Sequence, residues 1–208
     1  MGARRNRQKS ANLRLMVAEE AARIIVEHGV RDYLQAKSKA AEKLGVTGRF
    51  AMPRNTEIEN ALRERQALFE GHHHHQRLER LREAALRAMD FFQEFDPRLV
   101  GPVLDGTADD HSAVCLHLFA DTPEMVALYL HQNRVPFDES ARTIRTSRSQ
   151  SQTFPVFVFE AGGVAMDIMV LPEEVRRQAP LSPVDGRPMQ RASAREVAAM
   201  LEEPVGIA

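Results

Sequence analysis

The sequence predicts an α+β protein in which a helical N-terminal extension precedes a mixed β-sheet domain. Three observations support this prediction. The first ninety residues carry apolar side chains at helical spacing, the spacing changes to that of strands after "DPR" at 96–98, and the later elements read strand, strand, helix and hairpin. The formal net charge of −1 and the 27% of charged residues are typical of a globular protein, and favour neither a nucleic-acid nor a membrane partner for the chain as a whole.

Four helices are expected before residue 96. The first spans 12–28 and ends at Gly29, and the second spans 32–44 and begins at the capping residue Asp32. The third, 55–69, has Thr56 and Glu59 at capping-box spacing, and the fourth, 76–93, has the clearest apolar stripe. The inward positions predicted for them are Leu13, Met16, Val17, Ala21, Ile24, Ile25, Leu34, Ala41, Leu44, Ile58, Leu62, Phe69, Leu78, Leu81, Ala85, Ala88, Met89 and Phe92. The four histidines of 72–75 are interpreted as a solvated loop or helix start rather than a metal site.

The remaining elements define the sheet domain. Strands are expected in "LVGPVL" (99–104) and "AVCLHLFA" (113–120), and a helix over 122–133 with Pro123 at its first position. The segment 154–172 reads as a hairpin turned at Gly162-Gly163, and the last helix, 193–203, has a capping box formed by Ser193 and Glu196. The expected organisation is a helical extension over 1–72, a sheet domain over 73–172, and a C-terminal strap and helix over 173–208.

The segment "LVGPVLDGTADDHSAVCLHLF", residues 99–119, contains the first candidate site. Gly101 and Gly106 permit a close backbone approach to a ligand. If "GTADD" opens a short helix after Gly106, its free N–H groups, beginning at Thr107, would point at an anion.

This segment resembles the nucleotidyltransferase (polymerase-β-like) fold family, and in particular a bacterial branch with a degenerate metal-binding motif. Gly101 matches the first glycine of the family motif, with Pro102 in place of its serine; Gly106 matches the second glycine, Ser112 the serine before the acidic strand, and Asp167 the third acid. The order of elements agrees over about 76–171. The resemblance implies a nucleotidyltransferase-like domain that binds a nucleotide or an RNA end, with Mg²⁺ as the cofactor where catalysis survives. The nucleotide-binding residues that it implies are Gly101, Gly106 and Ser112, and Asp167 is the implied catalytic and metal-binding residue. Thr107 and His117 are further nucleotide-binding candidates that lie beside these positions in the sequence.

The chain departs from the family at the two acids that hold the metal ions. Residues i and i+2 of a strand share a face, and Ala113 and Cys115 stand where two carboxylates are expected. A methyl group and a thiol cannot hold Mg²⁺, which prefers oxygen ligands, so two-metal catalysis is expected to be impaired or lost and the protein to be a pseudoenzyme. The alternative is an active enzyme in which the loop acids Asp109 and Asp110 join Asp167 as metal ligands.

Three side chains of the sheet domain have other interpretations. Cys115, His117 and Asp167 form a possible Zn²⁺ set, although a buried thiol and a hydrogen-bonded histidine are more common. His111 or His117 is a possible general base. Asp167 interrupts an apolar strand, so its carboxylate must meet a cation, a donor or water unless it faces outward on a one-sided sheet.

Two further segments bear on partners. Residues 138–152 contain Arg142, Arg145 and Arg148, which could clamp phosphates, with Arg145 as the nucleotide-binding candidate; a solvated loop or an exposed strand is the simpler interpretation. The tail "APLSPVDGRPMQRAS" suggests an ordered strap or a partner-binding peptide. The expected partners are a nucleoside triphosphate or RNA, or a protein bound by the N-terminal helices, with no membrane. A cytoplasmic location is expected from the single cysteine and the absence of a long apolar run.

Overall fold

The computed structural model describes residues 2–30, 32–46, 51–69, 71–147 and 149–202 of an α+β chain. It divides into two compact units. The helical unit comprises Met1–His74 with Asp109–His111, and the sheet unit comprises His75–Ala108 with Ser112–Ala208. In the described part of the chain, no helix is both long and apolar enough to cross a membrane.

The helical unit contains α1 (Gly2–His28), α2 (Tyr33–Lys43) and α3 (Asn55–Phe69). The predicted first helix is confirmed at its end, where Gly29 has a φ of +61°, but it begins ten residues earlier than position 12, at Gly2. The cap of the second helix is confirmed, because Asp32 accepts hydrogen bonds from the N–H groups of Leu34 and Gln35. The predicted Thr56–Glu59 capping box is wrong: Glu57 accepts from the N–H of Arg54, and Glu59 pairs with Arg63.

The core of the helical unit is built mainly of small side chains. Val17, Ala21 and Ile58 are buried as predicted, but Leu13, Met16 and Leu34 are 40%, 48% and 65% exposed, which corrects their predicted inward placement. Alanines of α1 and α2 occupy the buried positions instead, and such small residues leave no room for leucine or methionine between the helices. The predicted inward side chain of Phe69 lies outside the described side chains.

The sheet unit contains a five-stranded mixed sheet in the order β1-β2-β5-β4-β3. Its strands are β1 (Arg98–Val100), β2 (Val114–Phe119), β3 (Asp138–Arg145), β4 (Ser151–Ala161) and β5 (Val164–Leu171). β2 and β5 are parallel, and the other neighbouring pairs are antiparallel. The predicted hairpin is confirmed as β4 and β5, and its turn residues Gly162 and Gly163 both have the positive φ that a two-residue hairpin turn requires.

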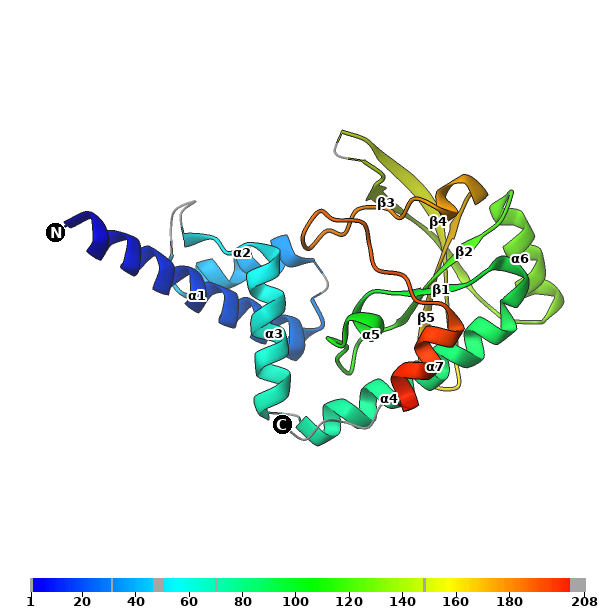
Figure 1. Ribbon diagram of the computed structural model, residues 1–208, viewed down its shortest axis with the longest axis horizontal. Helices are drawn as coiled ribbons and strands as arrows, with labels where there is room; N and C mark the ends of the chain where they lie inside the picture. The colour runs from blue at the N-terminus through cyan, green and yellow to red at the C-terminus, as the bar shows by residue number, and fades with distance from the viewer. Residues whose placement is uncertain (1, 31, 47–50, 70, 148, 203–208) are drawn as a thin grey trace. The chain divides into compact units, whose positions relative to one another are not determined.

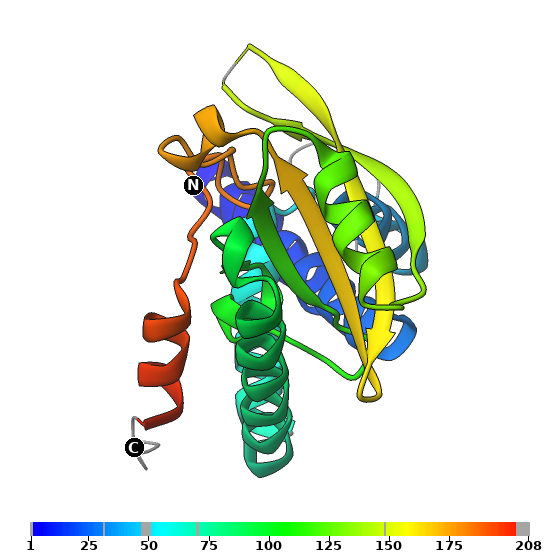
Figure 2. The same cartoon turned by 90° about the vertical axis from the view of Figure 1, so that its right-hand side faces the viewer.

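One face of the sheet carries the main core. Helices α4 (Gly71–Phe91), α6 (Pro123–Gln132) and α7 (Ala194–Glu202) contribute to it, and Figure 2 shows α6 lying along this face. The six inward positions predicted for the fourth helix are all buried, and that helix begins at Gly71, so the histidines 72–75 belong to its first turns. Val114, Leu116 and Leu118 of β2 and Val164, Met166, Ile168 and Val170 of β5 also point into this core.

The opposite face, here called the second face, carries the alternate residues of the same strands. Phe119, Phe154, Val156, Met169 and Leu171 form a smaller apolar cluster there. The strap, residues 172–193, adds Val175 to this cluster from within the short 3-10 helix η3 (Glu173–Arg176). Figure 1 shows the strap in orange, running from the end of β5 toward β3 and back to α7. The tail is therefore an ordered strap in the sheet unit.

Backbone hydrogen bonds attach the strap to both edge strands. The N–H of Leu181 donates to the carbonyl of Arg145 on β3 at 2.7 Å. Leu99 of β1 and Ala192 exchange two hydrogen bonds, at 2.8 and 2.9 Å. The strap therefore brings residues far along the chain onto the second face.

Candidate functional site

The segment that carries the family resemblance folds differently from the prediction. Only Arg98–Val100 is strand, and Pro102–Asp105 forms the one-turn helix α5. "GTADD" does not open a helix: Gly106 ends α5 in the left-handed conformation, and the N–H of Thr107 donates to the carbonyl of Pro102 at 2.9 Å. Because Ala108 is buried in the core, this loop turns inward and offers no row of free N–H groups at Thr107. The predicted helix-terminal anion site is therefore wrong.

The backbone conformation at position 101 requires a glycine. Its φ of 72° and ψ of −154° lie in a region that is essentially restricted to glycine. A Cβ at this position would lie 3.8 Å from Sγ of Cys115, an ordinary contact distance, so side-chain crowding is not the constraint. Gly101 thus turns the chain from β1 into α5 directly beside Cys115, while Ser112 is half-buried in the approach to β2.

Asp167 lies on the second face and is bound by an arginine. Nη1 and Nη2 of Arg142, on β3, donate to its two carboxylate oxygens at 3.1 and 2.6 Å. The side chain of Asp167 is 6% exposed and that of Arg142 is 46% exposed. Hydrogen bonding to Asp167 raises the pKa of Arg142 above its usual value. The expectation that this carboxylate meets a cation, a donor or water is confirmed, and its partner is a guanidinium of the same chain.

The residues around Asp167 do not fit a magnesium site. Cys115 and Val158 flank Asp167 on the neighbouring strands, and both of its oxygens are occupied by Arg142. Among the residues that the structure describes, no three His, Cys, Asp or Glu side chains converge as metal ligands. The Cys115, His117 and Asp167 set is therefore not assembled, and Asp109 and Asp110 belong to the helical unit rather than to the sheet unit that carries Asp167. Asp109 instead accepts a hydrogen bond from the N–H of His111.

His117 is a buried, hydrogen-bonded residue of the second face. Nε of Arg191, in the strap, donates to its Nδ1 at 3.3 Å, so the ring proton is assigned to Nε2. Burial, assisted by the positive charges of Arg191 and Arg142, lowers the pKa of His117 to about 3. An imidazole with this pKa is a poor general base at neutral pH, and the simpler interpretation of His117 as a hydrogen-bonded residue is the one that the geometry supports.

Arg191 belongs to a cluster of arginines beside His117, here called the arginine cluster and formed by Arg98, Arg176 and Arg191. Arg98 and Arg176 both pair with Asp96, at 2.6 and 3.4 Å. Arg176 and Arg191 place their guanidinium carbons 5.6 and 5.1 Å from the ring centroid of Phe119. The cluster thus combines three cations with an aromatic ring on the second face.

Arg191 is the least compensated member of the arginine cluster. Its Nη1 donates to the carbonyls of Val175 and Arg176, each at 3.1 Å. Its Nη2 is buried and has no hydrogen-bond partner within the described residues. Burial and the charge of Arg98 lower the pKa of Arg191 to about 10. Arg191 therefore combines an unsatisfied buried donor with a neighbouring like charge, and both are unfavourable.

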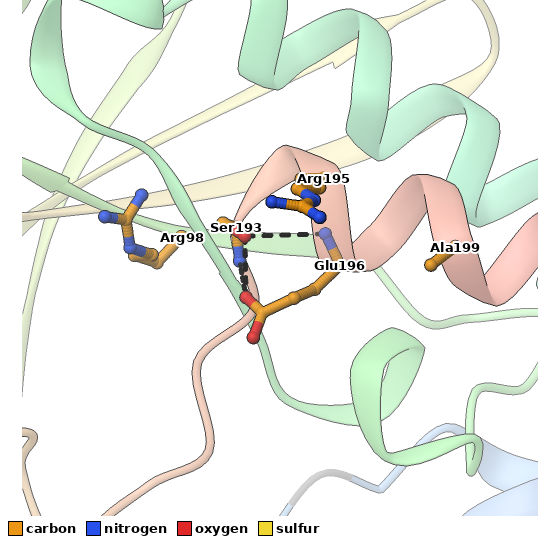
Figure 3. A pocket seen from close by; sticks show the side chains of 5 residues that line it. All are labelled: Arg98, Ser193, Arg195, Glu196 and Ala199. Carbon is orange, nitrogen blue, oxygen red and sulfur yellow. Dashed lines mark hydrogen bonds between the residues drawn. The ribbon is translucent and has the colours of Figure 1, made fainter.

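A pocket of about 550 Å³ lies beside the arginine cluster, at the N-terminal end of α7 (Figure 3). It is lined by Arg98, Ser193, Arg195, Glu196 and Ala199. The predicted Ser193–Glu196 capping box is confirmed here, because both the N–H and the hydroxyl of Ser193 donate to the Glu196 carboxylate. None of the sequence-predicted site residues lines this pocket. Arg98 takes part in both features: it lines the pocket, and its positive charge lowers the pKa of Arg191.

The structure brings some predicted site residues together and leaves others apart. His117 and Asp167 share the second face with Cys115, whereas Arg145 lies exposed at the end of β3, where the strap joins it. The pairing of Arg142 with Asp167 and the arginine cluster were missed. The available signal was the isolated acid in an apolar strand, which requires a cation, a donor or water, together with the arginines at 142 and in the tail.

A scan of the chain against models of known protein families finds no match, and a search of the curated proteins finds no significant relative.

Proposed function

We propose that this chain is a nucleotidyltransferase-fold protein that binds the phosphate of a nucleotide or an RNA end without two-metal transfer. The observation that carries the proposal is Arg191, a half-buried guanidinium that has one donor unpaired among the described residues and lies beside Arg98 and Arg176. Arginine is well suited to phosphate, because its planar array of donors matches two phosphate oxygens.

The surroundings of Asp167 support the absence of two-metal transfer. The guanidinium of Arg142 occupies both oxygens of the single acid that matches the family motif, and Cys115 lies beside it on β2. Binding to the arginine cluster is therefore expected to require no Mg²⁺. An active magnesium-dependent nucleotidyltransferase that uses Asp167 is the alternative, and the same experiment distinguishes the two.

The test is a calorimetric titration of the full chain with the four ribonucleoside triphosphates and a 5′-phosphorylated oligoribonucleotide, with Mg²⁺ and with EDTA. We expect binding in EDTA that weakens about tenfold or more in Arg191→Ala and in Arg98→Gln, since hydrogen bonds to charged groups contribute about 1.5–3 kcal/mol each. Arg134→Ala is the matched control, because Arg134 is an exposed arginine that follows α6. Arg98→Gln is included because Arg191 also supports the strap.

Three results would count against the proposal. Binding that appears only with Mg²⁺ and disappears in Asp167→Ala would favour the active enzyme. Binding that Arg134→Ala reduces as much as Arg191→Ala would remove the arginine cluster from the explanation. The lack of any binding would exclude both nucleotide functions.

A second candidate function is protein binding by the helical unit. Leu15, Met16 and Leu34 are 55%, 48% and 65% exposed on α1 and α2, and exposed large apolar side chains are common at interfaces. We expect a partner that co-purifies with the full chain to be lost from Leu15→Glu and Leu34→Glu, as measured by affinity purification and mass spectrometry. Lys39→Glu, on the exposed surface of α2, is the control. Equal recovery of the partner with all three variants would exclude these leucines from the interface.

A further inference from the structure

The two edges of the sheet differ in how they are protected. At β1 the strap closes the edge, since Leu99 and Ala192 exchange two hydrogen bonds. β3 forms the opposite edge and pairs with β4 over its eight residues, Asp138–Arg145, and the strap bonds to its outer side only at the last residue, Arg145. Seven of its eight residues are exposed. An edge strand with free backbone donors and acceptors is a template for pairing with another strand.

The register of β3 shows which backbone groups lie on the open side. In an antiparallel pair, residues that exchange hydrogen bonds alternate with residues that do not. The N–H of Thr146 donates to the carbonyl of Gln150 in the adjoining turn, so the even-numbered residues of β3 bond to β4. The carbonyl of Arg145 accordingly points outward and accepts from Leu181. The outward groups of Glu139, Ala141 and Thr143 have no backbone partner among the described residues.

The sequence of β3 shows which strand fits this edge. Its register with β4 contains no bulge, and the strand contains no proline, so two features that often prevent edge pairing are absent, and only its charges select the partner. Its acids, Asp138 and Glu139, come first, and its arginines, Arg142 and Arg145, come last. Antiparallel pairing with an identical strand aligns acids with arginines, whereas parallel pairing would align like charges. The charge pattern therefore favours a second copy of this chain over a neutral peptide.

We propose that β3 pairs antiparallel with β3 of a second copy, across a two-fold axis at Ala141. Both copies present odd-numbered residues, so Ala141 faces its own equivalent and Glu139 faces Thr143 of the second copy. Glu139 is then diagonal to Arg145 of the second copy, within reach of long side chains, whereas Arg142 remains paired with Asp167 of its own copy. The small Ala141 side chain at the axis avoids a like-charge contact. Two sheets of five strands become one continuous sheet of ten.

The first test is the mass of the full chain in solution from low micromolar to near-millimolar concentration, measured by sedimentation equilibrium. We expect a reversible monomer–dimer equilibrium that Ala141→Pro abolishes. Proline at this odd-numbered position removes an outward N–H but no hydrogen bond to β4, so the fold is retained and can be verified by circular dichroism. A monomer at every concentration, or a dimer that Ala141→Pro leaves intact, overturns the proposal.

The second test exchanges charges and leaves the backbone unchanged. Glu139→Arg and Arg145→Glu are each expected to raise the dimer dissociation constant about tenfold or more, because each substitution acts twice across the two-fold axis. The double variant with both substitutions restores the opposite charges and is expected to recover dimerisation to within about threefold of the unsubstituted chain. If the double variant associates no better than the single ones, β3 does not pair antiparallel with itself.

Discussion

Lowering the pH from 7.5 to 5 is expected to remove about 2 kcal/mol from the free energy of unfolding through His117 alone. Burial lowers the pKa of His117 in the folded chain to about 3, compared with 6.5 for an unperturbed histidine. Between these two values the unfolded state binds a proton that the folded state does not. The stability is therefore fully present above pH 6.5 and falls by about 1.4 kcal/mol for each pH unit below it, until the pH approaches the folded pKa.

The measurement is urea unfolding of the full chain and of His117→Gln across this pH range. Glutamine retains an acceptor for Nε of Arg191 but does not titrate, so the variant is expected to lose about 2 kcal/mol less than the unsubstituted chain between pH 7.5 and 5. His131→Gln is the matched control, because His131 is exposed on α6. Parallel pH profiles for the chain and His117→Gln would show that His117 is not buried in a neutral form.

The alternating pattern of the strands could be predicted from sequence because it is local. In β2, the assignment of Val114, Leu116 and Leu118 to the core and of Cys115, His117 and Phe119 to the other face needed only the two-residue period of a strand. The glycine pair of the β4–β5 hairpin and the Ser193–Glu196 capping box are equally local signals, and both are confirmed.

The sequence predictions that the structure contradicts depend on packing between helices or on which of two neighbouring residues begins a helix. Leu34 has the helical spacing of an inward residue, but the alanine-rich contact between α1 and α2 leaves it outside. Gly106 was expected to open a helix, but Pro102 already begins one, so Gly106 ends it. The spacing of apolar residues along one segment does not predict these two outcomes, because each depends on a neighbouring element of the chain.

The candidate site required knowledge of the topology. Arg142 is 25 residues from Asp167, and Arg191 is 74 residues from His117. The need of the Asp167 carboxylate for a cation, a donor or water could be predicted from its apolar strand. That the partner is Arg142 depends on β3 being the strand beyond β4. Arg191 reaches His117 only because the strap returns to β1. The chemistry of the second face is thus determined by the order of strands and the path of the strap.

Replacement of Arg142 with methionine is expected to lower the free energy of unfolding by about 2–3 kcal/mol. Removing one partner of a buried ion pair costs about 3–5 kcal/mol because the remaining charge is uncompensated, and the partial exposure of Arg142 reduces that cost. The carboxylate of Asp167, only 6% exposed, would lose the two hydrogen bonds and the positive charge that Arg142 supplies. Urea unfolding at pH 7.5 measures the loss.

The matched variants separate the ion pair from the strand that carries it. Arg145→Met, which places the same substitution at an exposed position of β3, is expected to cost no more than about 0.5 kcal/mol. Combining Arg142→Met with Asp167→Leu removes both charges, and since an apolar pair often replaces a buried ion pair without loss, most of the stability should return. A cost for Arg142→Met as small as that for Arg145→Met would mean that the Asp167 carboxylate reaches water without Arg142. In that case the carboxylate would be accessible to a metal ion, and the argument against two-metal transfer would lose its main support.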